Sequence, residues 1–256
     1  MEAIPYDSVL TNVLDNTDHR PWPLPDRPWV MRMNWHDLLF LHMPVPVAAI
    51  RERIPDELQV DTLDGRAWIG VIPFTMSGVT ARFLPAIPGL SAFPELNVRT
   101  YVTDGTHPGV WFFSLDAANA FAVHVARRLF DLPYHLADMQ SITVEDGIQY
   151  RSRRLGSGPP ARFSATYRPS GPAYHPEPGT PEAYFTRRYA LYTEDDHGRT
   201  LRCDVHHNPW KLQDATAEVK TNSMLKPLGI ETSSSETCLH YAEQVQAVAW
   251  RPVPVR

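Results

Sequence analysis

The chain has 256 residues, of which 43% are hydrophobic, and a formal net charge of −5 at pH 7. A chain of this size can bury one sizeable core, and its acidic balance excludes the basic surface typical of nucleic-acid-binding proteins. Neither an apolar run long enough to span a membrane nor a basic start followed by an apolar run is present, so we expect a cytoplasmic protein without membrane or nucleic-acid partners.

The first elements are predicted from proline positions and apolar runs. Residues 1–28 are rich in proline and tryptophan and are expected to form an extended segment in front of a single domain at 29–256. The apolar run at 33–42 has strand length, and residues 45–54 predict a short helix that stops at Pro55.

Three Asp-Gly pairs punctuate the middle of the chain. Apolar alternation flanks Asp64-Gly65, Asp104-Gly105 and Asp146-Gly147, and Asp-Gly tolerates the positive φ angles of tight hairpins. The sequence therefore predicts an antiparallel sheet. Further strand-like runs lie at 161–169, 200–207, 215–219 and 240–250; the last could also be helical, although its valine alternation favours a strand.

Two further helices are indicated. Residues 116–133 predict a helix capped by Asp116, with a core-facing stripe of Phe121, Val125 and Leu129, that ends at Leu132-Pro133. A second, shorter helix begins with Thr180 as cap and Pro181 in its first turn. The predicted fold is α+β: a many-stranded antiparallel sheet, long enough to close into a barrel, with a few outer helices.

The strand at 95–102 carries the most informative polar pattern. Alternate side chains of a strand share a face, so Glu95, Asn97, Arg99 and Tyr101 form one polar row. The row could face solvent, as in many half-buried strands, or line the inside of a closed barrel. Inside a barrel, Arg99 would bind a carboxylate and Glu95 would act as an acid/base or neutralise Arg99.

Two further groups of residues have both a structural and a functional interpretation. Tyr134 and His135, directly after Pro133, could stabilise an oxyanion and shuttle protons, or could only pack where a helix ends. His206 and His207 are adjacent and would point opposite ways on a strand, so no metal site is predicted. The serines at 223 and 233–235 lack acid/base partners nearby in sequence, so no serine triad is proposed.

Residues 35–74, 93–139 and 188–219 together resemble the YqjF-like bacterial family, domain-of-unknown-function family 2071, and the similarity extends over about residues 29–250. That family is similar in turn to the acetoacetate-decarboxylase-like superfamily, through "IPDELQVD" before a strand, the polar strand, and a helix that ends in proline followed by two polar residues. The resemblance implies a closed, cone-shaped antiparallel barrel with outer helices and a polar interior, and favours Glu95, Asn97 and Arg99 facing inward.

Decarboxylases of the superfamily carry two adjacent lysines just after that helix, one of which forms a Schiff base with a β-keto acid. At the corresponding positions this sequence has Tyr134 and His135, and its lysines, Lys211, Lys220 and Lys226, match no such position. Decarboxylation through an imine is therefore not expected.

Three functions remain open at this point. In the first, the barrel binds a small keto or hydroxy acid through Arg99, with Glu95, Asn97, Tyr134 and His135 completing the pocket. In the second, the protein is a lysine-independent lyase, isomerase or hydrolase, with His135 as acid/base and Tyr134 or Arg99 stabilising an oxyanion. In the third, it is a non-catalytic interaction module. No cofactor is implied, and a homo-oligomer is possible.

Overall fold

Strands dominate the chain in the computed structural model, which describes residues 13–85, 91–156, 158–232 and 236–255. The strands of this part are β1 (Met31–Val45), β2 (Gln59–Val60), β3 (Ala67–Ala81), β4 (Phe93–Thr103), β5 (Pro108–Ala117), β6 (Tyr134–Val144), β7 (Gly147–Arg154), β8 (Arg162–Tyr174), β9 (Ala190–Glu194), β10 (Thr200–His207), β11 (Leu212–Asn222), β12 (Cys238–Ala249) and β13 (Val253–Pro254). The helices are α2 (Val47–Arg51), α3 (Ala120–Phe130), α4 (Pro181–Thr186) and a 3₁₀ turn, η1 (Lys226–Leu228).

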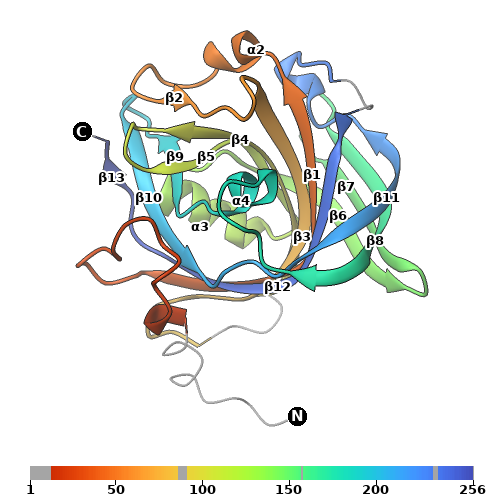
Figure 1. Ribbon diagram of the computed structural model, residues 1–256, viewed down its shortest axis with the longest axis horizontal. Helices are drawn as coiled ribbons and strands as arrows, with labels where there is room; N and C mark the ends of the chain where they lie inside the picture. Colours follow the sequence, from red (N-terminus) through yellow and green to blue (C-terminus); the bar gives the residue numbers. More distant parts are fainter. Residues whose placement is uncertain (1–12, 86–90, 157, 233–235, 256) are drawn as a thin grey trace.

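All of these strands belong to one sheet that branches (Figure 1). Neighbouring strands follow the order β13-β10-β9-β5-β6-β7-β8-β11-β12-β1-β3-β4-β2, and β4 also pairs with β5 and β10 with β12. Strands β5, β9, β10, β12, β1, β3 and β4 therefore form a cycle of pairings. Strands β6, β7, β8 and β11 form a second branch that connects β5 to β12.

The second branch closes another path of pairings through β12, β1, β3, β4 and β5, and these strands carry buried side chains on both faces. On β1, Leu39 and Leu41 pack in one apolar cluster, whereas Leu38 and Phe40 pack in the other. This division follows the alternation of side chains along a strand. One face of these strands is turned toward β9 and β10 of the cycle, and the other toward the second branch. A polar row on β4 therefore lies inside the protein and not at its surface.

The expected mostly-sheet α+β fold is confirmed, with two differences in strand pairing. β6 and β9 both run parallel to β5, pairing at Leu115–Ala117 and Val110–Trp111 respectively, so the sheet is not purely antiparallel. Helix α3 returns the chain between β5 and β6, and such a crossover makes a parallel neighbour possible.

The predicted hairpins formed at two of the three Asp-Gly pairs. β4 and β5 pair around Asp104-Gly105, and β6 and β7 around Asp146-Gly147. At Asp64-Gly65 only the single bridge between Leu63 and Arg66 forms, because β2 pairs with β4 instead of β3. The run at 240–250 is a strand, β12, as its valine alternation indicated.

The helix predictions are partly wrong for α3. Its N-cap is Asn119, whose side chain accepts a hydrogen bond from the Ala122 amide, whereas Asp116 is the buried last-but-one residue of β5. The predicted stripe is also wrong: Phe121 and Leu129 are each 58% exposed, and the buried side chains are Val123 and Phe130. The N-cap lies three residues later than expected, and the face toward the core is the one that carries Val123 and Phe130.

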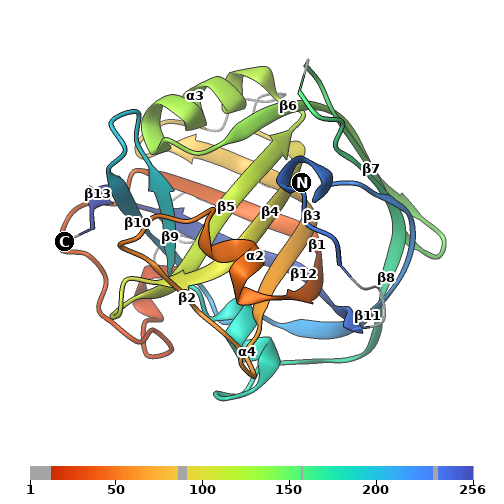
Figure 2. The ribbon, with the colours of Figure 1, turned by 90° about the horizontal axis from the view of Figure 1, so that it is seen from above.

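Helix α4 was predicted correctly, with Thr180 accepting a hydrogen bond from the Ala183 amide and proline in its first turn. Figures 1 and 2 show α3 and α4 at opposite ends of the strand cycle. Both helices therefore close the ends of the sheet, which differs from the outer position that the sequence indicated.

The segment before β1 lies along β10 and is fixed by polar contacts. Arg20 donates to the Val205 carbonyl at 2.8 Å, and Trp22 and Arg27 both bond the buried Asp204 carboxylate. The prediction that residues 1–28 form an extended segment falls partly on residues 1–12, which lie outside the described residues.

Candidate functional site

A cavity of about 120 Å³ lies inside the strand cycle. By this measure one water molecule needs roughly 10–15 Å³, so the cavity can hold a small organic molecule. Every strand of the cycle contributes to its walls, and α3 and α4 contribute to its ends. The lining that comes from the seven strands of the cycle comprises Met31, Met33, Trp35, Leu38, Ile72, Phe74, Met76, Glu95, Asn97, Arg99, Val110, Phe112, Leu115, Ala190, Leu191, Cys203, Val205, His207 and Ala249.

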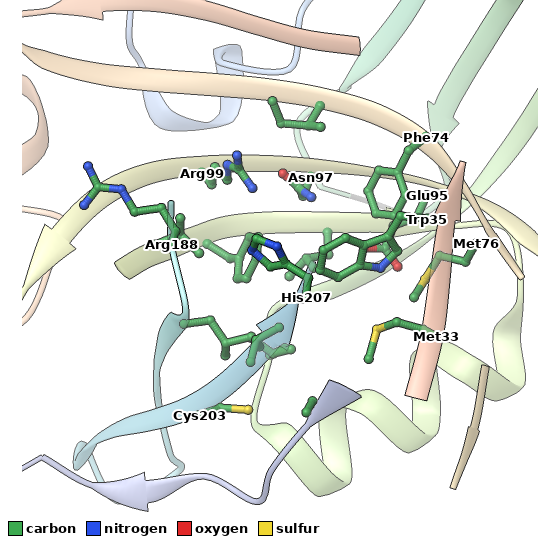
Figure 3. A pocket seen from close by; sticks show the side chains of 18 of the residues that line it. Met33, Trp35, Phe74, Met76, Glu95, Asn97, Arg99, Arg188, Cys203 and His207 are labelled. Carbon is green, nitrogen blue, oxygen red and sulfur yellow. The ribbon is translucent and has the colours of Figure 1, made fainter. Parts of the chain in front are cut away.

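The polar row of β4 contributes three of these residues. Glu95, Asn97 and Arg99 follow one another along the strand and face the cavity (Figure 3). At about 3.3 Å per residue, the Cα atoms of Glu95 and Arg99 are about 13 Å apart. The row therefore presents an acid, an amide and a guanidinium along the length of the cavity.

Glu95 and Tyr134 form a buried acid–phenol pair. The Tyr134 hydroxyl donates to Glu95 Oε2 at 2.9 Å. Burial is the main reason that the pKa of Glu95 is raised to about 8; the hydrogen bond from Tyr134 lowers it in part, and the nearby Asp116 contributes to the rise. Glu95 is therefore mostly protonated at pH 7, and it can donate a proton toward a bound molecule.

Arg99 is a half-buried cation with few partners. Its Nη2 makes only long hydrogen bonds, 3.4 Å to the Phe185 carbonyl and 3.5 Å to the Tyr101 hydroxyl. The Nε–H is buried without a hydrogen-bond partner, and no ion pair joins Arg99 to a carboxylate within the described residues. Since a desolvated cation without a counter-ion is costly, Arg99 is suited to bind an anionic ligand.

Asn97 lies between these two groups and is also unsatisfied. The residue is 6% exposed, and its Oδ1 has no hydrogen-bond partner in the described part of the protein. A buried amide without partners is rare in proteins. Its position in the cavity wall makes a ligand the natural partner.

Tyr101, the last member of the predicted row, supports Arg99 instead of lining the cavity. Its hydroxyl lies 2.5 Å from Nε2 of the fully buried His42, and its ring lies 5.7 Å below the Arg99 guanidinium. Burial lowers the pKa of His42 well below its usual value, with further lowering by Arg99. Because the Tyr101 oxygen accepts from Arg99 Nη2, the Tyr101 hydroxyl can donate its hydrogen bond to Nε2 of the neutral imidazole.

Several cavity residues could not be identified from the sequence. Arg188 lines the cavity near Arg99, where it pairs with Asp61 and packs over the Tyr101 ring at 4.9 Å. His207 is buried in the wall, and burial lowers its pKa to about 3. The adjacent His206 faces away, as alternation on a strand requires. Most of the remaining lining is apolar, so the interior is less polar than the resemblance implied.

His135 does not join the other predicted site residues. β6 begins at Tyr134, so the two neighbouring side chains point to opposite sides of the strand. Tyr134 lines the cavity, whereas His135 is absent from the described lining. Burial, together with the nearby Arg154 and Arg127, lowers the pKa of His135 to about 4. The structure therefore does not bring His135 together with Glu95 and Arg99.

The described lining contains no lysine. Lys211, Lys220 and Lys226 are all exposed. Across the described ranges, no group of three or more histidine, cysteine, aspartate or glutamate side chains could hold a metal ion. No helix in this part of the chain is both long and apolar enough to span a bilayer.

Comparison with solved structures first defines the class of fold. The chain aligns with acetoacetate decarboxylase from Legionella pneumophila over 100% of its own length and 98% of that chain, at 11% identity and a TM-score of 0.59. It also aligns with the enduracididine biosynthesis enzyme MppR in complex with pyruvate, over 91% of this chain and 93% of the other, at 10% identity and a TM-score of 0.59. The fold is therefore acetoacetate-decarboxylase-like.

Sequence comparison then defines the family. Residues 32–246 match DUF2071, described as an "Uncharacterized conserved protein (COG2071)". The chain is 44% identical over 227 residues to "Uncharacterized protein YqjF" of Bacillus subtilis (strain 168), which covers 89% of this chain and 93% of that protein. The chain belongs to the DUF2071 family, as its sequence indicated.

Proposed function

We propose that the protein binds a small keto or hydroxy acid in the cavity, with the ligand carboxylate on Arg99. The observation that carries this proposal is the cavity-facing guanidinium without a carboxylate partner in the described residues. An arginine fork binds a carboxylate through two parallel hydrogen bonds. The pyruvate complex of MppR, which shares the fold, supports the same ligand class, and a cavity supports a binding protein over an interaction module with a filled interior.

The proposal also takes the cycle of seven strands as a closed barrel whose interior is the binding site. It further holds that the protein is not an acetoacetate decarboxylase that works through a Schiff base, because tyrosine and histidine occupy positions 134 and 135. The cytoplasmic location, the possible homo-oligomer and the division at residue 29 remain predictions.

Calorimetric titration with pyruvate tests the proposal. Arg99→Gln keeps a polar, unbranched stem but is shorter and removes the charge, and we expect its affinity for pyruvate to fall at least tenfold, because a charge-assisted hydrogen bond contributes roughly 1.5–3 kcal/mol. Arg151→Ala is the control, since Arg151 is exposed on β7 and does not line the cavity. Equal pyruvate affinity in Arg99→Gln and the unmodified protein would refute the assignment of Arg99.

A second candidate function is lysine-independent acid/base catalysis on the same ligands, as a lyase, isomerase or hydrolase. It is favoured by the buried Glu95–Tyr134 pair, which places a titrating acid at the cavity wall. Because general acid/base catalysis is most effective with a pKa near the operating pH, Glu95 replaces His135 in this role, with Tyr134 or Arg99 stabilising an oxyanion.

Deuterium exchange at C3 of pyruvate, followed by NMR in D₂O, measures such proton transfer. The expected result is exchange that increases toward pH 8 and is lost in Glu95→Gln. Borohydride reduction in the presence of pyruvate should leave no covalent adduct detectable by mass spectrometry. Exchange that persists in Glu95→Gln excludes Glu95 as the base, and a reduced adduct on a lysine would show that an imine forms after all.

A further inference from the structure

The cavity is polarised along its length (Figure 3). The end near α4 holds Arg99 and Arg188, and α4 itself contributes Phe185 and Thr186. The opposite end, near α3, is walled by Met33, Met76 and Trp35, with Phe130 of α3. A ligand that fills the cavity therefore meets positive charge at one end and apolar surface at the other.

The apolar end is a poor site for water. Met33 and Met76 are 7% and 4% exposed, and apolar cavities in proteins remain dry but accept apolar guests. Glu95 is the acidic group nearest to this end in Figure 3. Since burial raises its pKa to about 8, it is mostly uncharged at pH 7 and does not repel the hydrophobic part of a ligand.

We infer that the ligand is an amphipathic monocarboxylic acid, whose carboxylate binds Arg99 and whose alkyl or aryl tail extends along β4 to Met33 and Met76. The inference rests on the proposed function, which places the ligand carboxylate on Arg99, and extends it by assigning a site to the ligand's hydrophobic tail. The Cα atoms of Arg99 and Glu95 are about 13 Å apart along β4, and Met76 pairs with Phe93, further still from Arg99, so pyruvate is too short to contact both ends. Between them, the unpartnered Oδ1 of Asn97 can accept a hydrogen bond from a hydroxyl of the ligand.

The two methionines at the apolar end, Met33 and Met76, also predict that ligands with tails of different shapes can bind. Methionine is unbranched and has three rotatable side-chain bonds, so it adapts to irregular partners. A straight alkyl chain and a phenyl ring should therefore both be accepted at this end, and the carboxylate should be the fixed requirement.

A ligand series in calorimetry tests this inference on the unmodified protein. Pyruvate, 2-oxobutanoate, 2-oxohexanoate and 2-oxooctanoate share the same head and differ in tail length, and 2-octanone lacks the carboxylate. We expect the Kd to fall about fourfold for each buried methylene, 2-octanone to bind at least tenfold more weakly than 2-oxooctanoate, and phenylpyruvate to bind more tightly than pyruvate.

Two matched variants locate the tail. Met33→Gln makes the wall polar at nearly constant size and should weaken 2-oxooctanoate binding at least tenfold while leaving pyruvate within twofold. Met33→Leu keeps the wall apolar and should retain the dependence on chain length. If Met33→Gln fails to fold, the ligand series on the unmodified protein still tests whether a hydrophobic tail contributes to binding.

The outcomes separate the two proposals. Equal Kd values for pyruvate and 2-oxooctanoate would overturn the tail inference and leave the proposed function standing. A chain-length dependence that is unchanged in Met33→Gln would overturn the placement at the methionine end. If no acid binds, or if Arg99→Gln binds every acid as tightly as the unmodified protein, the proposed function fails and the tail inference fails with it.

Discussion

Glu95 shows how burial changes the charge state of a single side chain. A carboxyl group in the interior loses the hydration that stabilises its ionised form, so its pKa rises to about 8 in the folded protein. The Tyr134 hydroxyl bonds only one of its oxygens in the structure and does not offset that loss. The same burial that makes Glu95 a useful acid thus makes it a source of pH-dependent stability.

Glu95→Gln should remove this pH dependence. Between the unfolded pKa, about 4.5, and the folded pKa, about 8, only the folded state holds the proton, so the free energy of unfolding falls as pH rises, by at most about 1.4 kcal/mol per pH unit. Glutamine stays neutral and keeps an oxygen that can accept the Tyr134 hydroxyl. Urea unfolding at pH 6.5 and 8 should show the decrease in the unmodified protein and little in the variant; parallel slopes would contradict an elevated pKa.

Whether a site residue could be predicted depends on the sequence separation between that residue and the others that form the site. The row Glu95, Asn97 and Arg99 follows from strand alternation alone. Arg188 and His207 enter the cavity only because β9 and β10 lie opposite β4, and no local pattern carries that information. His135 was placed with Tyr134 because both follow the helix, but β6 begins there and turns them to opposite sides.

At the scale of the element, Asp116 could serve either as the N-cap of helix α3 or as a residue of the preceding strand, β5. The sequence "DAAN" offers Asp116 and Asn119 as caps, and both residue types cap helices well. Arg154, 38 positions away, settles the outcome by donating to both Asp116 oxygens, with Nη2 at 2.6 Å from Oδ1. Asp116 therefore completes β5, and Asn119 caps α3. Local helix propensity therefore predicted that α3 exists, but where α3 begins depends on the Arg154–Asp116 ion pair, whose partners are distant in sequence.

Asp116→Asn and Asn119→Ala should separate these roles. Asp116→Asn leaves the Arg154 guanidinium, 11% exposed, without its anionic partner and should lower the free energy of unfolding by about 3 kcal/mol. Asn119→Ala removes one cap hydrogen bond and should cost about 1 kcal/mol. Urea denaturation gives both values. A larger loss in Asn119→Ala than in Asp116→Asn would mean that the cap outweighs the ion pair.

At the scale of the whole molecule, the segment before β1 is held to β10 through neutral imidazoles. His206 donates from Nε2 to the Val13 carbonyl at 2.7 Å and accepts at Nδ1 from Arg20 at 3.2 Å. The bond from Arg20 requires the singly protonated ring with its proton on Nε2, because a doubly protonated imidazole has no nitrogen left to accept from arginine. Burial lowers the pKa of His206 to about 4, with an opposing effect of the Val13 bond.

Acid should therefore detach this segment. Between pH 6.5 and about 4 only the unfolded state takes up the proton of His206, so the free energy of unfolding falls as pH falls, by at most about 1.4 kcal/mol per pH unit for this residue. Limited proteolysis should cleave near residues 13–22 faster at pH 4 than at pH 7. His206→Gln cannot titrate and should show a smaller acceleration; identical acceleration in both proteins would show that another group controls the release.

The pairing of β1 with β12 has a consequence for synthesis on the ribosome. Met31–His42 pair with Cys238–Ala249, so one edge of β1 has no partner until residues 238–249 have been translated. Contacts so distant in sequence form late and slowly. The nascent chain consequently leaves this edge of β1, with Met33, Trp35 and Phe40, uncovered until then, and the cavity can form only after β12 leaves the exit tunnel.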